Sequence, residues 1–223
     1  QLLPPRRQSL FFSATMPQNI QELADTILLD PVTVEVERRS SAAETVEQKV
    51  YFVRQAEKKH LLVDVLTAPD VTSALVFTRT KYGADKLVRH LRKQGVRSEA
   101  IHGNKSQGAR TRALQGFKDG RVRVLVATDI AARGIDIQQL PHVVNLDLPN
   151  VAEDYVHRIG RTGRAGECGH AISLVAAEEA LLLKAIERTT NERLERVLVP
   201  GFEPKVLEAP PLDLSGGRGR RAP

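Results

Sequence analysis

Three arginines recur at every third position in residues 157–166, which read HRIGRTGRAG and also contain three glycines. Arg158, Arg161 and Arg164 each carry a permanently charged planar fork that meets phosphate oxygens through two parallel hydrogen bonds. The glycines let the backbone turn tightly and approach a ligand closely. A solvated basic loop is the alternative, but such a loop does not need this spacing. The segment therefore predicts half of a nucleotide site.

The other half of such a site is missing from the sequence. No Gly-x-x-x-x-Gly-Lys-Ser/Thr phosphate loop occurs, and an Asp-Glu-Ala-Asp or similar acidic run is also absent. The phosphate loop is the element that would hold the β- and γ-phosphates by its amides and lysine, and magnesium by its hydroxyl. We therefore expect the chain to be part of a larger enzyme.

Composition favours one intracellular α/β domain. The 223 residues, 41% of them hydrophobic, are enough for one sizeable core. A net charge of +6 favours an anionic partner such as nucleic acid. The single cysteine, Cys168, excludes an internal disulfide, and the six histidines lack the spacing of metal ligands, so no structural metal is expected. Neither a signal peptide nor a membrane-spanning apolar run is recognisable, which makes the cytoplasm the expected compartment.

Short apolar runs alternate with amphipathic stretches along the middle of the chain. Nearly continuous apolar runs are typical of strands covered on both faces, and we predict four of them, at residues 74–77, 122–127, 143–146 and 171–175. Amphipathic stretches predict helices at residues 81–94, 106–118 and 176–188. This alternation predicts an α/β fold with a mostly parallel sheet, helices on both faces, and ligands at the carboxyl ends of the strands.

Both ends of the chain differ from this middle part. Residues 8–12 predict a strand without an obvious partner, followed by a helix from Met16 and Pro17 to about Leu29. At the other end, four prolines precede a glycine- and arginine-rich stretch that cannot bury enough apolar surface to order itself. This basic tail could still touch nucleic acid.

Five segments, in order and spacing, resemble the later motifs of DEAD-box RNA helicases, and the bacterial RhlE-like branch is the closest. They are residues 13–15 (SAT), 76–81 (VFTRTK), 107–110 (QGAR), 127–137 (ATDIAARGIDI) and the arginine-glycine segment. The resemblance covers residues 8–190. It implies a second RecA-like domain at residues 31–195, preceded by the end of the first domain at residues 1–30 and followed by a tail at residues 196–223.

The resemblance also implies the nucleotide-binding residues. Arg161 and Arg164 match the arginine fingers of the family, which stabilise charge on the γ-phosphate of ATP. Asp136 matches an acid that contacts the ribose, although it could instead cap the following turn. Gly134 would let the backbone approach the nucleotide, although a plain turn would use it equally well. ATP would bind with Mg²⁺, and the metal ligands would lie on the missing first domain.

Three residues match family positions that contact the backbone of single-stranded RNA: Thr80, Arg110 and Thr128. As alternatives, Thr80 caps the next helix, Arg110 lies on a solvated face and Thr128 ends a strand. No base-stacking aromatic is recognised near the motifs, which predicts weak sequence preference. A basic helix over residues 81–93 is interpreted as solvated surface rather than an RNA patch.

Four further residues match family positions that couple the two domains: Ser13, Thr15, His157 and Arg158. The hydroxyl groups of Ser13 and Thr15 would contact the acidic motif, which this chain lacks. An ordinary salt bridge is the alternative for Arg158.

The function that follows from the resemblance is the C-terminal half of an ATP-dependent RNA helicase, inactive when isolated from the first domain. Two alternatives stay open: a stand-alone RNA- or partner-binding module, and a fragment of a DNA-directed helicase or translocase. RNA, single-stranded or duplex, and the missing N-terminal RecA-like domain are the expected partners. RNA-processing or ribosome-assembly proteins are further candidates, and no membrane is expected.

Overall fold

The computed structural model describes residues 4, 7–13, 16, 18–34, 46–133, 135, 137, 140–163 and 168–202. The chain divides into two compact units, residues 1–39 and 40–223. The predicted boundary after residue 30 falls inside the first unit. Most of the tail predicted at residues 196–223, the part from residue 203 onward, lies outside the described residues.

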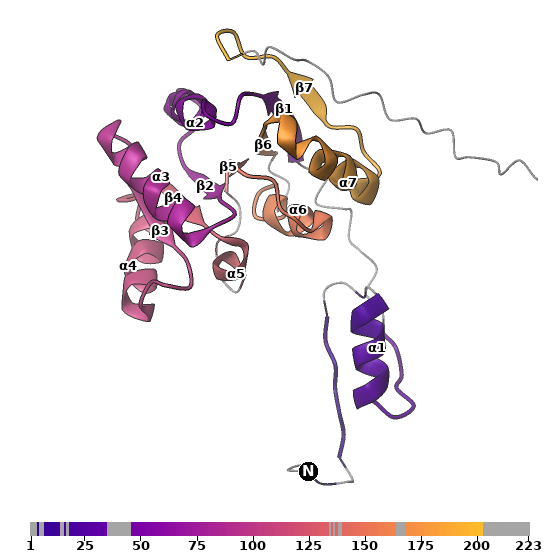
Figure 1. Ribbon diagram of the computed structural model, residues 1–223. Coiled ribbons are helices and arrows are strands. Elements are labelled where there is room, and N and C mark those ends of the chain that lie inside the picture. The colour runs from indigo at the N-terminus through magenta and orange to yellow at the C-terminus, as the bar shows by residue number, and fades with distance from the viewer. Residues whose placement is uncertain are drawn as a thin grey trace, which may run out of the picture. The chain divides into compact units, whose positions relative to one another are not determined.

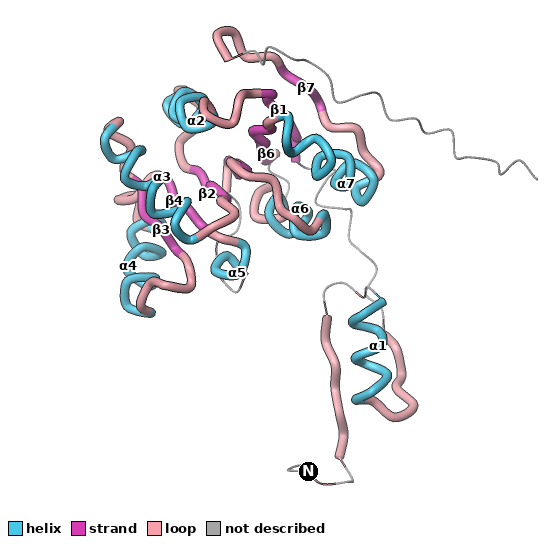
Figure 2. Tube along the Cα trace, viewed as in Figure 1, coloured by secondary structure: helices cyan, strands magenta, loops and turns pink. Residues whose placement is uncertain are grey.

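The first unit contains one described helix, α1 (Gln18–Ile27). It lies within the helix predicted from Met16 to Leu29. The strand predicted at residues 8–12 is wrong, because these residues form a loop (Figure 2). A strand requires a backbone partner, and no described segment pairs with them. Large apolar side chains of this unit are exposed, among them Phe12, Leu29 and Val32.

The second unit is built on a parallel sheet whose order, in its described part, is β3-β4-β2-β5-β6-β1-β7. The strands are β1 (Val46–Phe52), β2 (Ala74–Phe77), β3 (Ser98–Ile101), β4 (Val124–Ala127), β5 (His142–Asn145), β6 (Gly169–Val175) and β7 (Glu195–Val197). The helices are α2 (Lys58–Thr67), α3 (Lys81–Lys93), α4 (Gln107–Lys118), α5 (Asp129–Ala132), α6 (Ala152–Ile159), the 3₁₀ helix η2 (Ala177–Glu179) and α7 (Ala180–Thr190).

Alternate residues of β2 and β4 enter apolar cores on opposite faces of the sheet. Val76 of β2 packs in a cluster with α2 and α3, whereas the neighbouring Phe77 packs in a second cluster with α4. A third cluster joins β1 and β6 to α6 and α7, which lie side by side in Figure 1. Because Val143 of the second cluster pairs directly with Ala171 of the third, these two clusters line the same face. The predicted parallel sheet with helices on both faces is confirmed.

The sheet continues beyond the predicted end of this domain at residue 195. Strand β7 pairs with β1, and the partly buried Val199 and Phe202 pack against the first core cluster. The domain therefore extends at least to Phe202. No described helix is both long and apolar enough to cross a bilayer.

Candidate functional site

The carboxyl ends of β3, β4 and β2 lie next to one another, because these strands are neighbours in a parallel sheet. Thr80 follows β2, Thr128 directly follows β4, and Arg110 lies in the first turn of α4, which follows β3. The structure thus brings the three predicted RNA-binding residues to one edge of the sheet. Ligands of such sheets bind at this edge.

Thr80 is the N-cap residue of α3. Its Oγ1 accepts a hydrogen bond of 3.0 Å from the backbone N–H of Gly83. A Cβ at Gly83 would lie 2.9 Å from Oγ1, so the glycine leaves room for this arrangement. The capping interpretation is therefore confirmed. Because the hydroxyl accepts in this bond, its own proton is left to donate to a phosphate or sugar oxygen.

The loop after β3 is held against α3 at the same edge. Lys81 Nζ donates to Asn104 Oδ1 at 3.0 Å, and Asp85 pairs with Lys105 at 2.8 Å and with His102 at 3.2 Å. Burial raises the pKa of Asp85, but the hydrogen bonds from Lys105 and His102 outweigh it and hold the pKa below its usual value. The carboxylate therefore stays ionised and holds the loop after β3 against α3.

The other two predicted RNA-binding side chains have weak partners. Arg110 is half-buried, and its Nη1 lies 3.4 Å from Gln107 Oε1, which is a long hydrogen bond. Thr128 occupies the N-cap position of α5 without a capping hydrogen bond from its side chain. Both side chains can turn to a ligand without breaking a strong contact. Their contact with RNA stays a prediction.

Arg158 lies inside the second unit, with 2% of its surface exposed. Its Nε and Nη2 donate to the two carboxylate oxygens of Asp129 at 2.6 and 2.8 Å. Nη1 donates to Asn145 Oδ1 and to the Asp147 carbonyl, and the guanidinium lies 4.8 Å from the Phe77 ring centroid. The salt-bridge interpretation is confirmed. The interdomain coupling predicted for Arg158 stays a prediction, for a guanidinium that is buried with four of its donors in use.

The segment around Arg161 is anchored by its backbone. The Arg161 carbonyl accepts from the Leu140 N–H at 3.1 Å, and the buried Thr162 hydroxyl donates to the Leu140 carbonyl. Arg161 itself is half-buried, and its Nη1 donates to the Ile135 carbonyl at 3.1 Å. Gly169 packs so closely on this segment that a Cβ there would lie 1.9 Å from Thr162 Oγ1. A glycine farther along the chain thus sets the position of the arginine segment.

Several predicted site residues are elsewhere or are not described. His157 is exposed in the last turn of α6, and Ser13 belongs to the first unit. Their predicted coupling between domains stays a prediction. Four predicted residues lie outside the described residues: Thr15, Gly134, Asp136 and Arg164.

Sequence reasoning missed a buried ion pair below the same edge. Lys58 of α2 pairs with Glu179 and donates to the Leu146 carbonyl at 2.8 Å, and burial lowers the pKa of this lysine. Glu179 also accepts from Arg79 Nη2 and from the Leu148 N–H, both at 3.2 Å. The cluster therefore ties the segments after β2, β5 and β6 together. The signal in the sequence was the position of Lys58 on the apolar stripe of α2.

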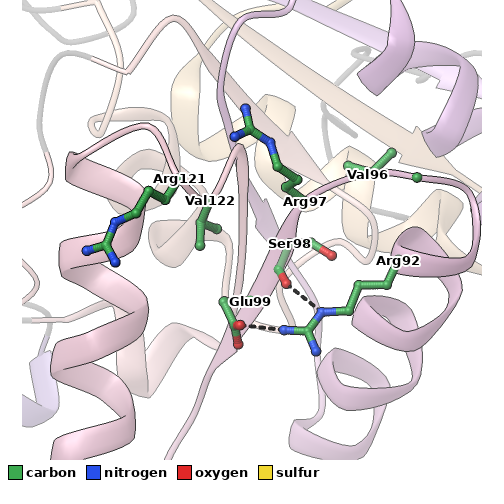
Figure 3. A pocket seen from close by; sticks show the side chains of 8 residues that line it. Arg92, Val96, Arg97, Ser98, Glu99, Arg121 and Val122 are labelled. Carbon is green, nitrogen blue, oxygen red and sulfur yellow. Dashed lines mark hydrogen bonds and ion pairs between the residues drawn. The ribbon is translucent and has the colours of Figure 1, made fainter.

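A hollow of about 320 Å³ lies away from this edge, where β3 begins. Figure 3 shows Arg97 and Arg121 pointing in different directions. Arg92 donates to the Ser98 carbonyl and to the Glu99 carboxylate, so its charge is already neutralised. The arginines do not converge on a common point, and the hollow is no anion site. Arg92 instead covers part of the free edge of β3.

Comparison with known proteins identifies the class of protein that has this fold and this arrangement of residues at the carboxyl edge of the sheet. Residues 57–166 match the family model described as helicase conserved C-terminal domain. The chain is 41% identical over 201 residues to the DEAD-box ATP-dependent RNA helicase CshA of Bacillus subtilis, covering 90% of this chain and 41% of that protein. The chain thus spans about two fifths of the length of this relative.

Solved structures agree with this assignment. The chain is 41% identical to a chain in the crystal structure of the E. coli DEAD-box protein SrmB bound to RraA, with a TM-score of 0.70, and the match covers 74% of this chain and 97% of that one. It is 32% identical to S. cerevisiae Dbp5 bound to RNA and ADP BeF3, with a TM-score of 0.76, over 88% of this chain and 52% of that one. The chain belongs to the DEAD-box protein family, as a C-terminal RecA-like helicase domain.

Proposed function

We propose that the second unit is the C-terminal half of an ATP-dependent RNA helicase that clamps single-stranded RNA by its backbone. The observation that carries the proposal is the meeting of Thr80, Arg110 and Thr128 at the carboxyl edge of three adjacent strands. Hydroxyl groups and a guanidinium gathered there suit phosphate and sugar oxygens, which carry no sequence information. Structural similarity to RNA-bound Dbp5 supports the same ligand class.

Arg161 and Arg164 would serve ATP held by a first domain. The half-buried Arg161 carries a planar guanidinium, whose fork of N–H donors suits phosphate oxygens. No group of three or more His, Cys, Asp or Glu side chains in the described part is placed to hold a metal ion. Following the resemblance to the family, we assign the Mg²⁺ ligands to the first domain. Bound there, Mg²⁺ would neutralise phosphate charge, and Arg161 would stabilise the charge that develops during hydrolysis.

The first unit would be the end of that first domain. Its exposed Phe12, Leu29 and Val32 suit burial against further elements of a larger core. We also propose that the protein belongs to the RhlE-like branch, works in the cytoplasm and contacts ribosome-assembly proteins.

The test compares this chain with a protein that also carries the first domain. We expect RNA-stimulated phosphate release only from the two-domain protein. There, Arg161→Lys should lower turnover nearly as much as Arg161→Ala, because lysine keeps the charge but loses the planar fork. Arg121→Ala, at an exposed arginine beside the hollow, serves as the control and should leave turnover unchanged. Full ATPase activity in Arg161→Lys, combined with weaker RNA binding, would move Arg161 from the nucleotide to the RNA surface.

A further inference from the structure

Tyr82 is an aromatic side chain left open to solvent, with 73% of its surface exposed. Every other described aromatic side chain of the second unit is buried or half-buried: Tyr51, Phe52, Phe77, Phe117, Tyr155 and Phe202. An aromatic ring buries a large apolar surface when it finds a partner. The exposed ring of Tyr82 therefore stands out as a surface that a partner could cover.

This ring lies at the edge where the candidate RNA-binding residues meet. Tyr82 belongs to the first turn of α3, between the N-cap Thr80 and Gly83, whose N–H bonds to Thr80 Oγ1. Lys81 Nζ lies 5.3 Å from the centroid of the Tyr82 ring and is bonded to Asn104. An open π-face, an ammonium group and a hydroxyl thus occupy one short stretch of the edge.

We propose that Tyr82 stacks on a base of the RNA strand whose backbone lies on Thr80, Arg110 and Thr128, an inference that rests on the proposed function. A nucleotide presents a phosphate and a base at opposite ends of one sugar. Thr80 and Lys81 suit the phosphate, and the ring of Tyr82 suits the base. Stacking accepts every base, so it adds affinity while leaving sequence preference weak. The proposal departs from the sequence-based interpretation that no base-stacking aromatic lies near the motifs, but it keeps the expected weak sequence preference.

The magnitude of the effect follows from measured stacking energies. Loss of a stacking aromatic costs about 1–3 kcal/mol per base, which corresponds to about 5- to 150-fold in affinity. Because Tyr82 is so exposed, its replacement should leave the folded state intact. Loss of affinity in Tyr82→Leu therefore reports on the ligand and not on folding.

The experiment measures binding of the chain to a labelled single-stranded RNA and to a matched abasic strand by fluorescence anisotropy. We expect Tyr82→Phe to bind both strands like the parent chain. Tyr82→Leu should lose at least about fivefold on RNA and nothing on the abasic strand. Leu181→Ala, which changes a 77% exposed apolar residue of α7, is the control and should bind like the parent.

A second readout follows from composition. The chain has no tryptophan and three tyrosines, so its intrinsic emission comes from tyrosine. RNA should quench part of this emission in the parent chain, and the quenching should disappear in Tyr82→Leu.

The outcomes separate the two proposals. If the parent chain does not bind RNA, both the proposed function and the stacking proposal are overturned. If the parent binds and Tyr82→Leu binds equally well, only stacking is rejected. An equal loss on RNA and on the abasic strand would also reject it, since the ring would then touch the backbone and not a base.

Discussion

Replacement of Gly169 by alanine tests how the arginine segment is positioned. A Cβ at this site would lie 1.9 Å from Thr162 Oγ1, 2.8 Å from Thr162 Cβ and 2.4 Å from the backbone nitrogen of Gly163. Rotation of the threonine side chain removes the first contact but not the contact with backbone. The segment that carries Arg161 must therefore move away from β6.

The cost can be worked from two terms. Overpacking of a closely packed site costs about 1–3 kcal/mol. Loss of the hydrogen bond from Thr162 to the Leu140 carbonyl, both buried, adds about 1–3 kcal/mol. We expect Gly169→Ala to lower the free energy of unfolding by about 2–6 kcal/mol, against a total of about 5–15 kcal/mol for a typical domain.

Urea unfolding followed by circular dichroism measures this loss. Gly108→Ala, in α4, is the matched control, because a methyl group at the exposed Gly108 would meet only the Arg112 side chain, at 3.5 Å. It should be neutral or stabilising by up to about 1 kcal/mol. In a Thr162→Ala background, Gly169→Ala should cost less but still destabilise, because the contact with Gly163 remains.

In the two-domain protein, Gly169→Ala should also slow ATP hydrolysis at a temperature where the protein stays folded. A misplacement of about 1 Å costs on the order of 100-fold in rate. RNA binding without nucleotide should change little, because Thr80, Arg110 and Thr128 lie on segments that follow β2, β3 and β4, away from Gly169 in the sequence. A free energy of unfolding within about 0.5 kcal/mol of the parent would refute the close packing of Gly169 on Thr162.

Three further predictions concern other contacts. Arg158→Met should destabilise the chain by about 3–5 kcal/mol in urea unfolding, because it leaves Asp129 without its buried partner. The control Arg133→Ala, which breaks the exposed pair with Asp154, should cost about 0–1 kcal/mol. Equal losses would contradict the burial of Arg158. Gly83→Ala should give a more favourable change in the free energy of unfolding in a Thr80→Ala background than in the parent, because Oγ1 of Thr80 then no longer crowds the new methyl group. Additive changes in this free energy would show that the two residues do not interact. Burial, with a smaller contribution from the neighbouring His170, lowers the pKa of His142. The unfolded state therefore binds the proton more tightly, and the free energy of unfolding should fall as the pH drops from about 6.5 toward the folded-state pKa of His142. His142→Phe should flatten this pH dependence in urea titrations, and an unchanged slope would contradict the prediction.

Local pattern predicted the elements whose residues are apolar throughout or strongly amphipathic. Strand β2 was predicted with its observed bounds, and α3 differed from its prediction by one residue. Strands β1 and β3 were not predicted, because each contains polar residues among its apolar ones and so lacks a continuous apolar run. Their burial comes from pairing with β6 and β4, which a local pattern does not contain.

The order and spacing of the motifs were likewise enough to select the candidate site residues, but they did not predict which side chains these residues contact. The sequence alone was enough to place Thr80 at a helix start and to select the arginine segment. Only the tertiary structure paired Arg158 with Asp129, set Gly169 against Thr162 and left Tyr82 exposed at the edge. The physical reason is that helix caps and strand periodicity depend on neighbours in the chain. Burial and ion pairing instead depend on which strands become neighbours in the sheet, and here that order is β3-β4-β2-β5-β6-β1-β7 in the described part.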